Sequence, residues 1–162
     1  MKIILNKLPE TVDEFKALEI FDLSKAENLC ALFLCALNIY NKDPKQGIEA
    51  MNIIRGPRPM NGIDEQFLKD RMRGKTYLAT AYFENATSEN AYLPKAPYIV
   101  EVLDDPRPQD LEENYRRFFL KTAGADSPRP IKLRQKGNEW FLWEYSSILS
   151  GIKLPAAEDP WA

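Results

Sequence analysis

The chain has 162 residues, of which 44% are hydrophobic and 28% charged, which is typical of a globular domain large enough to bury its own core. Lysine and arginine number 22 against 24 acidic residues, and this net charge of −2 gives no reason to expect a nucleic-acid or anionic-membrane partner. The chain has no histidine, so Ser-His-Asp and Cys-His nucleophile systems, histidine-ligated zinc and histidine general bases are excluded within it.

The beginning of the chain and its cysteines indicate the compartment. Residues 1–6 turn polar too soon for a signal peptide, and the apolar run at residues 29–37 is far shorter than the roughly 20 residues that span a bilayer. Cys30 and Cys35 have neither redox-motif nor zinc-pair spacing, so we expect two small buried apolar side chains. These features predict a cytoplasmic protein without a membrane anchor.

Two capping boxes predict the first helices. They are TVDE at residues 11–14 and SKAE at residues 24–27. Apolar residues continue the first helical pattern through Leu18 to Phe21. The second helix is expected to run to about residue 40, and its middle, residues 29–37, is apolar on every side, so other elements have to enclose it.

Two further helices are predicted before Gly74. Asp43 as N-cap and Pro44 in the first turn open a helix that ends at Gly56. The string GPRP at residues 56–59 is a stiff break, because each proline disfavours the helical conformation of the residue before it. A short helix is expected over residues 63–73. Its carboxylates lie among lysines and arginines, which favours salt bridges over a metal site.

The periodicity then changes from helix to strand. Residues 77–83 fit either type, whereas residues 97–103 and 115–122 predict strands. Helices followed by strands predict an α+β fold, in which N-terminal helices pack on a C-terminal curved antiparallel sheet. We expect one domain over residues 1–162, with a helical part at about 10–73, a sheet part at about 77–150 and an extended tail at 155–162.

The last two strands form a predicted hairpin. Gly137 and Asn138 suit a two-residue primed turn, because both tolerate positive φ. Lys136 then faces Glu139, and the later cross-strand pairs follow from that register. The face that carries Trp140 is mostly aliphatic and is predicted to lie on the core.

Two carboxylates are catalytic candidates. In the predicted register Glu144 lies opposite Ile131 and points inward, where burial would raise its pKa as in general acids and bases. The alternative is a solvated or paired Glu144 at the rim, and a one-residue slip would move it to the other face. Asp126 is the second candidate, although with Ser127 it also fits a turn.

The other face of the hairpin lays cations over aromatic rings, Arg134 over Phe141 and Lys132 over Trp143. It favours a solvent face on which basic stems shield aromatic area. The alternative is a binding surface for an anionic or aromatic ligand. A group of tyrosines could line a cavity or the edge of the core. The ligand-binding candidates are therefore Arg129, Lys132, Arg134, Trp140, Trp143 and Tyr98.

Several strings resemble an uncharacterised domain family of Firmicutes-type bacteria, over about residues 51–162. They are GPRPM at 56–60, QFLKDR at 66–71, YFENAT at 82–87, ADSPRP at 125–130, WFLWE at 140–144 and DPW at 159–161. This resemblance implies no activity and no catalytic residues. The order of elements is also similar to the cystatin-like roll of the NTF2-like superfamily, which would imply a conical pocket between sheet and helices in either an enzyme or a binding module.

The sequence therefore favours a non-catalytic module that binds a small molecule or a protein, without metal or cofactor, and that forms a homodimer through its sheet. The missing histidine and the lack of a tight acid–base group support this hypothesis. One alternative is a lyase- or isomerase-type enzyme that uses Glu144 or Asp126 with a tyrosine. Another is an anion or nucleic-acid binder that uses Arg129, Lys132, Arg134 and Lys136, although nucleic acid is not the expected partner.

Overall fold

The computed structural model describes residues 1–162 and contains four α-helices and five β-strands. The helices are α1 (Val12–Lys16), α2 (Asn28–Lys42), α3 (Pro44–Arg55) and α4 (Gly62–Met72). The strands are β1 (Lys2–Leu5), β2 (Tyr98–Asp104), β3 (Tyr115–Leu120), β4 (Arg129–Lys136) and β5 (Glu139–Glu144). Short 3₁₀ turns complete the structure at η1 (Thr80–Tyr82), η2 (Pro108–Asp110), η3 (Ser146–Leu149) and η4 (Ala156–Glu158).

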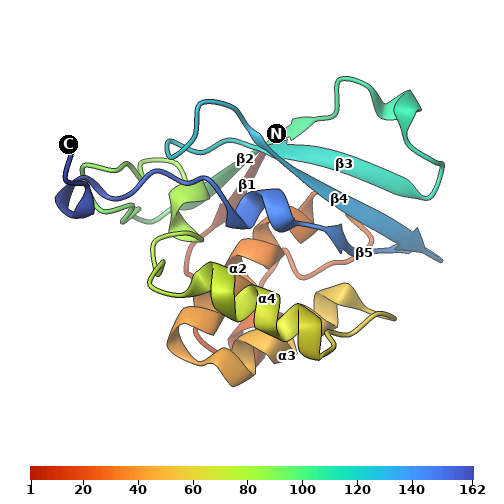
Figure 1. Ribbon diagram of the computed structural model, residues 1–162. Coiled ribbons are helices and arrows are strands. Elements are labelled where there is room, and N and C mark those ends of the chain that lie inside the picture. Colours follow the sequence, from red (N-terminus) through yellow and green to blue (C-terminus); the bar gives the residue numbers. More distant parts are fainter.

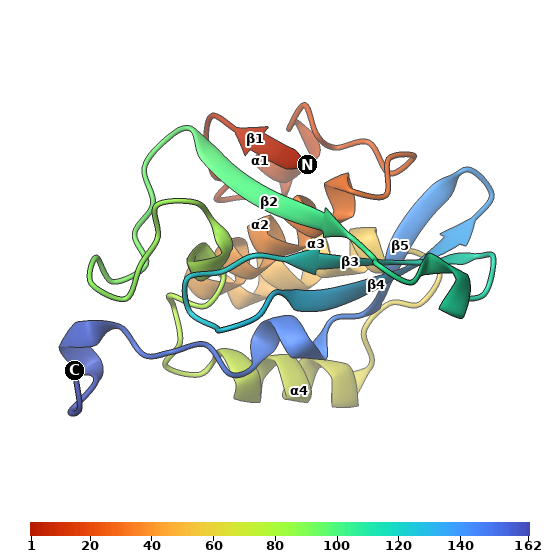
Figure 2. The ribbon, with the colours of Figure 1, turned by 90° about the horizontal axis from the view of Figure 1, so that it is seen from above.

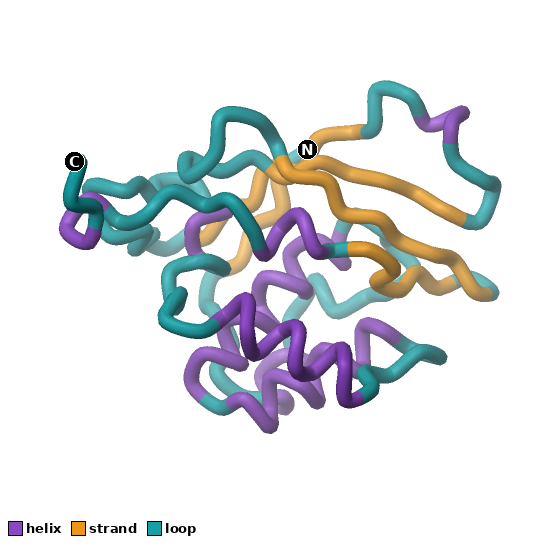
Figure 3. Tube along the Cα trace, viewed as in Figure 1, coloured by secondary structure: helices purple, strands orange, loops and turns teal.

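The strands form one antiparallel sheet in the order β1-β2-β3-β4-β5. The sheet curls, and the four α-helices gather below it while none of them lies over the opposite face (Figures 1 and 3). Seen from above, the strands cross over α2 and α3 (Figure 2). The predicted α+β fold, with helices packed on a curved antiparallel sheet, is confirmed.

Strand β1 was not predicted, because the prediction placed the whole sheet after Gly74. It pairs with β2, with Ile3 opposite Val100, so the first residues of the chain join its second half. Ile3 and Leu5 are buried and alternate with exposed residues, as on a strand with one covered face. Four residues are too few for this alternation to be distinguished in a sequence.

Helix α2 lies in the middle of the core. Residues 29–37 are fully buried and belong to a hydrophobic cluster of 35 residues drawn from helices and sheet, which confirms the predicted enclosure. The helix begins at Asn28, not at a Ser24 cap. The backbone N–H and the hydroxyl of Ser24 both donate to the Asp22 carboxylate, and this local turn uses the side chain that was expected to cap the helix.

The other predicted ends are mostly confirmed. Thr11 caps α1, Asp43 caps α3 with Pro44 in the first turn, and α4 lies where a short helix was expected. Helix α1 is shorter than predicted and stops at Lys16. Residues 77–83 form turns and the 3₁₀ turn η1. None of the helices combines the length and hydropathy that a membrane crossing requires.

Candidate functional site

The hairpin of β4 and β5 has the predicted two-residue turn. Gly137 has a φ of 63°, which glycine adopts without strain. Lys136 pairs with Glu139, and Arg134 pairs with Phe141, as the turn requires. The first half of the hairpin therefore follows the register that the sequence predicts.

The second half does not follow that register. The pairing shifts between Lys132 and Leu133, so Lys132 lies opposite Glu144. Glu144 is consequently exposed on the outer face, whereas the prediction placed it inward opposite Ile131. The predicted pairing with Ile131 was wrong because a β-bulge exchanges the faces of the residues beyond it, and the structure shows the predicted alternative, a solvated Glu144. The main catalytic candidate has thereby lost the burial on which its role depended.

The outer face of the hairpin carries the predicted cations over aromatic rings, but with changed partners. The guanidinium carbon of Arg134 lies 4.6 Å from the centre of the Trp143 ring and 5.4 Å from that of Tyr115. The Lys132 ammonium lies 4.8 Å from the Tyr115 ring. Tyr115, on β3, meets Trp143 edge to face at 5.8 Å. These rings hold the long basic side chains in defined positions.

The loop after α3 closes over the same aromatic residues. Gly56 has a φ of 61°, and a Cβ atom there would lie 2.3 Å from the Phe141 ring, so only glycine fits. Two residues later, Arg58 stacks on Trp143 with its guanidinium carbon 4.1 Å from the ring centre. Arg58 also donates to the Trp143 carbonyl at 2.7 Å, which satisfies a backbone acceptor of edge strand β5.

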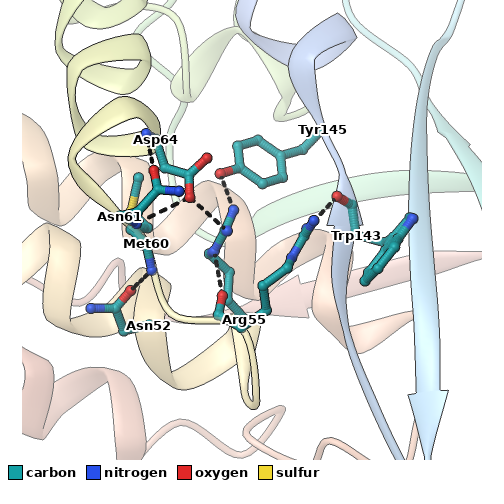
Figure 4. A network of polar contacts seen from close by, with 8 residues as sticks. Asn52, Arg55, Met60, Asn61, Asp64, Trp143 and Tyr145 are labelled. Atoms are coloured by element: carbon teal, nitrogen blue, oxygen red, sulfur yellow. Dashed lines mark hydrogen bonds and ion pairs between the residues drawn. The ribbon is translucent and has the colours of Figure 1, made fainter.

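A buried arginine fixes this loop against the hairpin (Figure 4). Arg55 is only 4% exposed and donates three hydrogen bonds. They reach the Arg58 carbonyl at 2.9 Å, the Tyr145 hydroxyl at 2.7 Å and the Asp64 carboxylate at 3.0 Å. Burial raises the pKa of the Tyr145 hydroxyl, while the Arg55 cation acts in the opposite direction. These bonds connect helix α3 with the loop that follows it, with helix α4 and with the residue that follows strand β5.

Both ends of the loop are held as well. The Met60 N–H donates to Asn52 at 2.8 Å, and the Asn61 N–H donates to Asp64 at 3.1 Å (Figure 4). Asn61 caps α4 in return by accepting from the Asp64 N–H. The loop is thus a rigid wall rather than a free connection.

Loop and hairpin enclose what we call the hairpin groove. Its volume is about 500 Å³, within the range of roughly 300–1,000 Å³ that is usual for ligand sites. The lining residues that matter here are Arg55, Arg58, Arg134, Lys136, Phe141 and Trp143. Arg58, Arg134 and Lys136 are exposed, and none of them has a carboxylate within 4.0 Å, in contrast to Arg55 and its partner Asp64. The groove therefore presents three cations that the fold does not neutralise.

A second hollow, the polar cavity, lies beside η1 and the loop after β3. It has a volume of about 420 Å³ and is lined by, among others, Tyr82, Glu84, Glu101, Lys121, Thr122 and Asp126. Its charges are largely paired within the molecule. Glu84 lies 2.7 Å from Lys2, and Glu101 lies 3.4 Å from Lys121.

The second catalytic candidate, Asp126, is exposed at this polar cavity. Tyr82 also lines the cavity, but its hydroxyl donates to the Ile148 carbonyl at 2.7 Å, and burial raises its pKa. A tyrosine in this state is a structural donor rather than a proton carrier. The structure therefore provides no carboxylate–tyrosine pair here that is prepared for proton transfer.

Four binding candidates do not line the groove, and one of them is Lys132, which contacts the Tyr115 ring. Arg129 donates to the Gly151 carbonyl at 3.0 Å and so fastens the C-terminal segment. Trp140 is buried in the core, as its predicted face requires. Tyr98 packs edge to face on Phe83 and lines neither hollow. No group of three or more Cys, Asp or Glu side chains is placed to hold a metal ion.

Sequence reasoning missed Arg55, Arg58 and Tyr115. Arg55 follows Met51 by four residues, so both lie on one helix face, and a cation on a buried face indicates a buried partner. This signal could have identified Arg55. Arg58 was part of a predicted rigid connector, and no local pattern connects that connector with Trp143, 85 residues later.

The comparisons with known proteins agree with the resemblance found in the sequence. The profile of a family described as a domain of unknown function (DUF6935) matches residues 7–156. The chain belongs to this family. No curated protein and no solved structure shows a significant match, so the similarity to the NTF2-like roll stays a prediction.

Proposed function

We propose that this member of the DUF6935 family is a binding module that holds an anionic group of its partner in the hairpin groove. One observation carries the proposal. Three exposed cations, Arg58, Arg134 and Lys136, converge on a groove with aromatic walls, and none of them has a carboxylate partner. Some cations elsewhere on the molecule are paired, such as Lys2, Lys42 and Lys121.

The geometry suits carboxylate or phosphate recognition. Stacking on Trp143 holds Arg58 and Arg134 in place, so less side-chain freedom is lost when an anion binds. Arg58 uses one N–H for the Trp143 carbonyl, and its other donors remain for a ligand. Guanidinium groups bind planar carboxylates and phosphates through paired hydrogen bonds.

The proposal includes a non-catalytic role and a cytoplasmic location. The exposed position of Glu144 removes the main support for an enzyme, and we propose no second function. Cys30 and Cys35 are both free and buried, which is consistent with a reducing compartment.

Calorimetric titration with pyrophosphate and with citrate at low ionic strength tests the proposal, because one probe presents phosphate and the other carboxylate groups. We expect binding to the native protein, and a loss of affinity of about tenfold or more in Arg134→Glu, since a hydrogen bond to a charged group contributes roughly 1.5–3 kcal/mol.

Lys121→Glu is the matched control, because it reverses an exposed cation that already has a partner. We expect it to bind both probes as the native protein does. Failure of the native protein to bind either anion, or an equal loss in both variants, would contradict the proposal.

A further inference from the structure

The C-terminal segment carries the most exposed large hydrophobic side chain of the molecule. Trp161 is 93% exposed. It belongs to a turn in which the Trp161 N–H donates to the Asp159 carboxylate at 2.9 Å and the Ala162 N–H donates to the Asp159 carbonyl at 3.2 Å. Tryptophan is highly buried on average in folded proteins and is enriched among the residues that contribute most to protein–protein binding.

The chain just before this turn is fastened to the body of the protein. The Ala156 N–H donates to the Ser88 carbonyl at 2.8 Å, and the Lys153 carbonyl accepts from the Tyr92 hydroxyl at 2.8 Å. Residues 158–161 therefore project from a fixed base. This presentation lowers the entropy that a binding event has to overcome.

The projecting segment complements the hairpin groove in chemistry. Glu158 and Asp159 have no cation within 4.0 Å, just as the groove cations have no carboxylate within that distance. Trp161 offers an aromatic face to the guanidinium groups of Arg58 and Arg134, the contact that Trp143 already makes with both. Acidic and aromatic groups thus occur in one short segment, and their binding partners occur in one groove.

Segment and groove cannot meet within one molecule. The C-terminus and strand β5 lie at opposite ends of the protein in two perpendicular views (Figures 1 and 2). We infer that residues 158–161 of one copy dock in the hairpin groove of a second copy, an inference that rests on the proposed anion-binding role of the groove. In the dimer that we infer, the two copies are antiparallel, so that each segment occupies the groove of the other copy and the assembly closes with two-fold symmetry.

Sedimentation velocity over a concentration series tests the inference. We expect a native dimer, and an increase of its dissociation constant by at least about tenfold in Trp161→Ala and in Glu158→Lys/Asp159→Lys, because each removes one part of the contact. Leu93→Ala is the matched control, since Leu93 is 66% exposed but lies outside the segment. It should leave the dimer unchanged.

Charge exchange identifies the groove as the receptor. Arg134 and Lys136 are exposed and form no ion pair, so Arg134→Glu/Lys136→Glu preserves the fold while weakening the dimer. Combining it with Glu158→Lys/Asp159→Lys should restore dimerisation, since the opposite charges then face each other again. Pyrophosphate should dissociate the native dimer by competing for the groove.

A native protein that sediments as a monomer throughout, a dimer that Trp161→Ala leaves intact, or reversed charges that do not rescue each other would overturn the inference. Titration of the Trp161→Ala variant with pyrophosphate then separates the two proposals. Binding to this variant without native dimerisation leaves the anion site standing and removes only the segment as its partner.

Discussion

The two hollows of this protein are of similar size but differ in how their charges are neutralised. In the polar cavity Glu84 and Glu101 pair with Lys2 and Lys121, so its polar lining is stabilised by partners within the fold. In the hairpin groove Arg58 and Arg134 contact aromatic rings, and neither they nor Lys136 have a carboxylate partner. The difference teaches that a hollow indicates a binding site more strongly when its charges remain unpaired than when it is merely polar.

The largest expected effect is a loss of stability when the buried Arg55 beside the groove is replaced. Arg55→Met should lower the free energy of unfolding by about 3 kcal/mol, because it leaves the Tyr145 hydroxyl, the Asp64 carboxylate and the Arg58 carbonyl without their buried donor. Urea unfolding measures this change. Arg73→Met is the control, because its pair with Asp70 is exposed and should contribute less than about 0.5 kcal/mol. Similar losses in the two variants would show that the buried contacts of Arg55 stabilise the protein no more than an exposed ion pair does.

The tyrosines behind the two hollows provide a smaller effect. Burial raises the pKa of Tyr82 and, against the opposing Arg55 cation, that of Tyr145 above the ordinary value of 10.0. Both protonated hydroxyls therefore stabilise the fold fully below pH 10, and this contribution is lost as the pH rises above 10 toward the folded-state pKa. While Tyr82 remains protonated only in the fold, the loss is about 1.4 kcal/mol per pH unit.

Stability measured at several alkaline pH values should thus decline less steeply in Tyr82→Phe than in the native protein. Tyr145→Phe should reduce the slope less, since Arg55 partly offsets the effect of burial. An unchanged slope in Tyr82→Phe would mean that water reaches the Tyr82 hydroxyl in the folded protein, so that its pKa is not raised.

The smallest expected effect is a weak anion affinity of the polar cavity after one of its cations has been freed from its partner. Glu101→Gln removes the partner of Lys121 and leaves a free cation at the cavity. In an Arg134→Glu background, which disables the groove, we expect a gain in pyrophosphate affinity of less than about fivefold, because exposed pairs contribute only about 0.2–1 kcal/mol. Calorimetric titration of Arg134→Glu and of Arg134→Glu/Glu101→Gln with pyrophosphate measures the gain. Strong binding there would contradict the view that the groove owes its function to preorganised arginines.

Much of the groove could be predicted from the hairpin, and the rest could not. The turn at Gly137 and the cations over aromatic rings follow from short-range pattern and alternation. The prediction was wrong for Glu144 because a bulge depends on how two strands fit against the sheet, which alternation does not encode. The second wall was missed because Arg58 and Trp143 meet only when the chain is folded.

The sequence alone therefore predicted the local features correctly. These are the caps at Thr11 and Asp43, the enclosed apolar helix α2 and the hairpin turn. The absence of histidine also excluded the reactions that need this residue. These features depend on residues a few positions apart, whose geometry the backbone itself dictates. Packing alone decided the face of Glu144, the partners of Arg55 and the separation of the groove from Trp161. Those depend on contacts between distant segments, such as Arg55 and Tyr145 90 residues apart, and their formation is a property of the whole core.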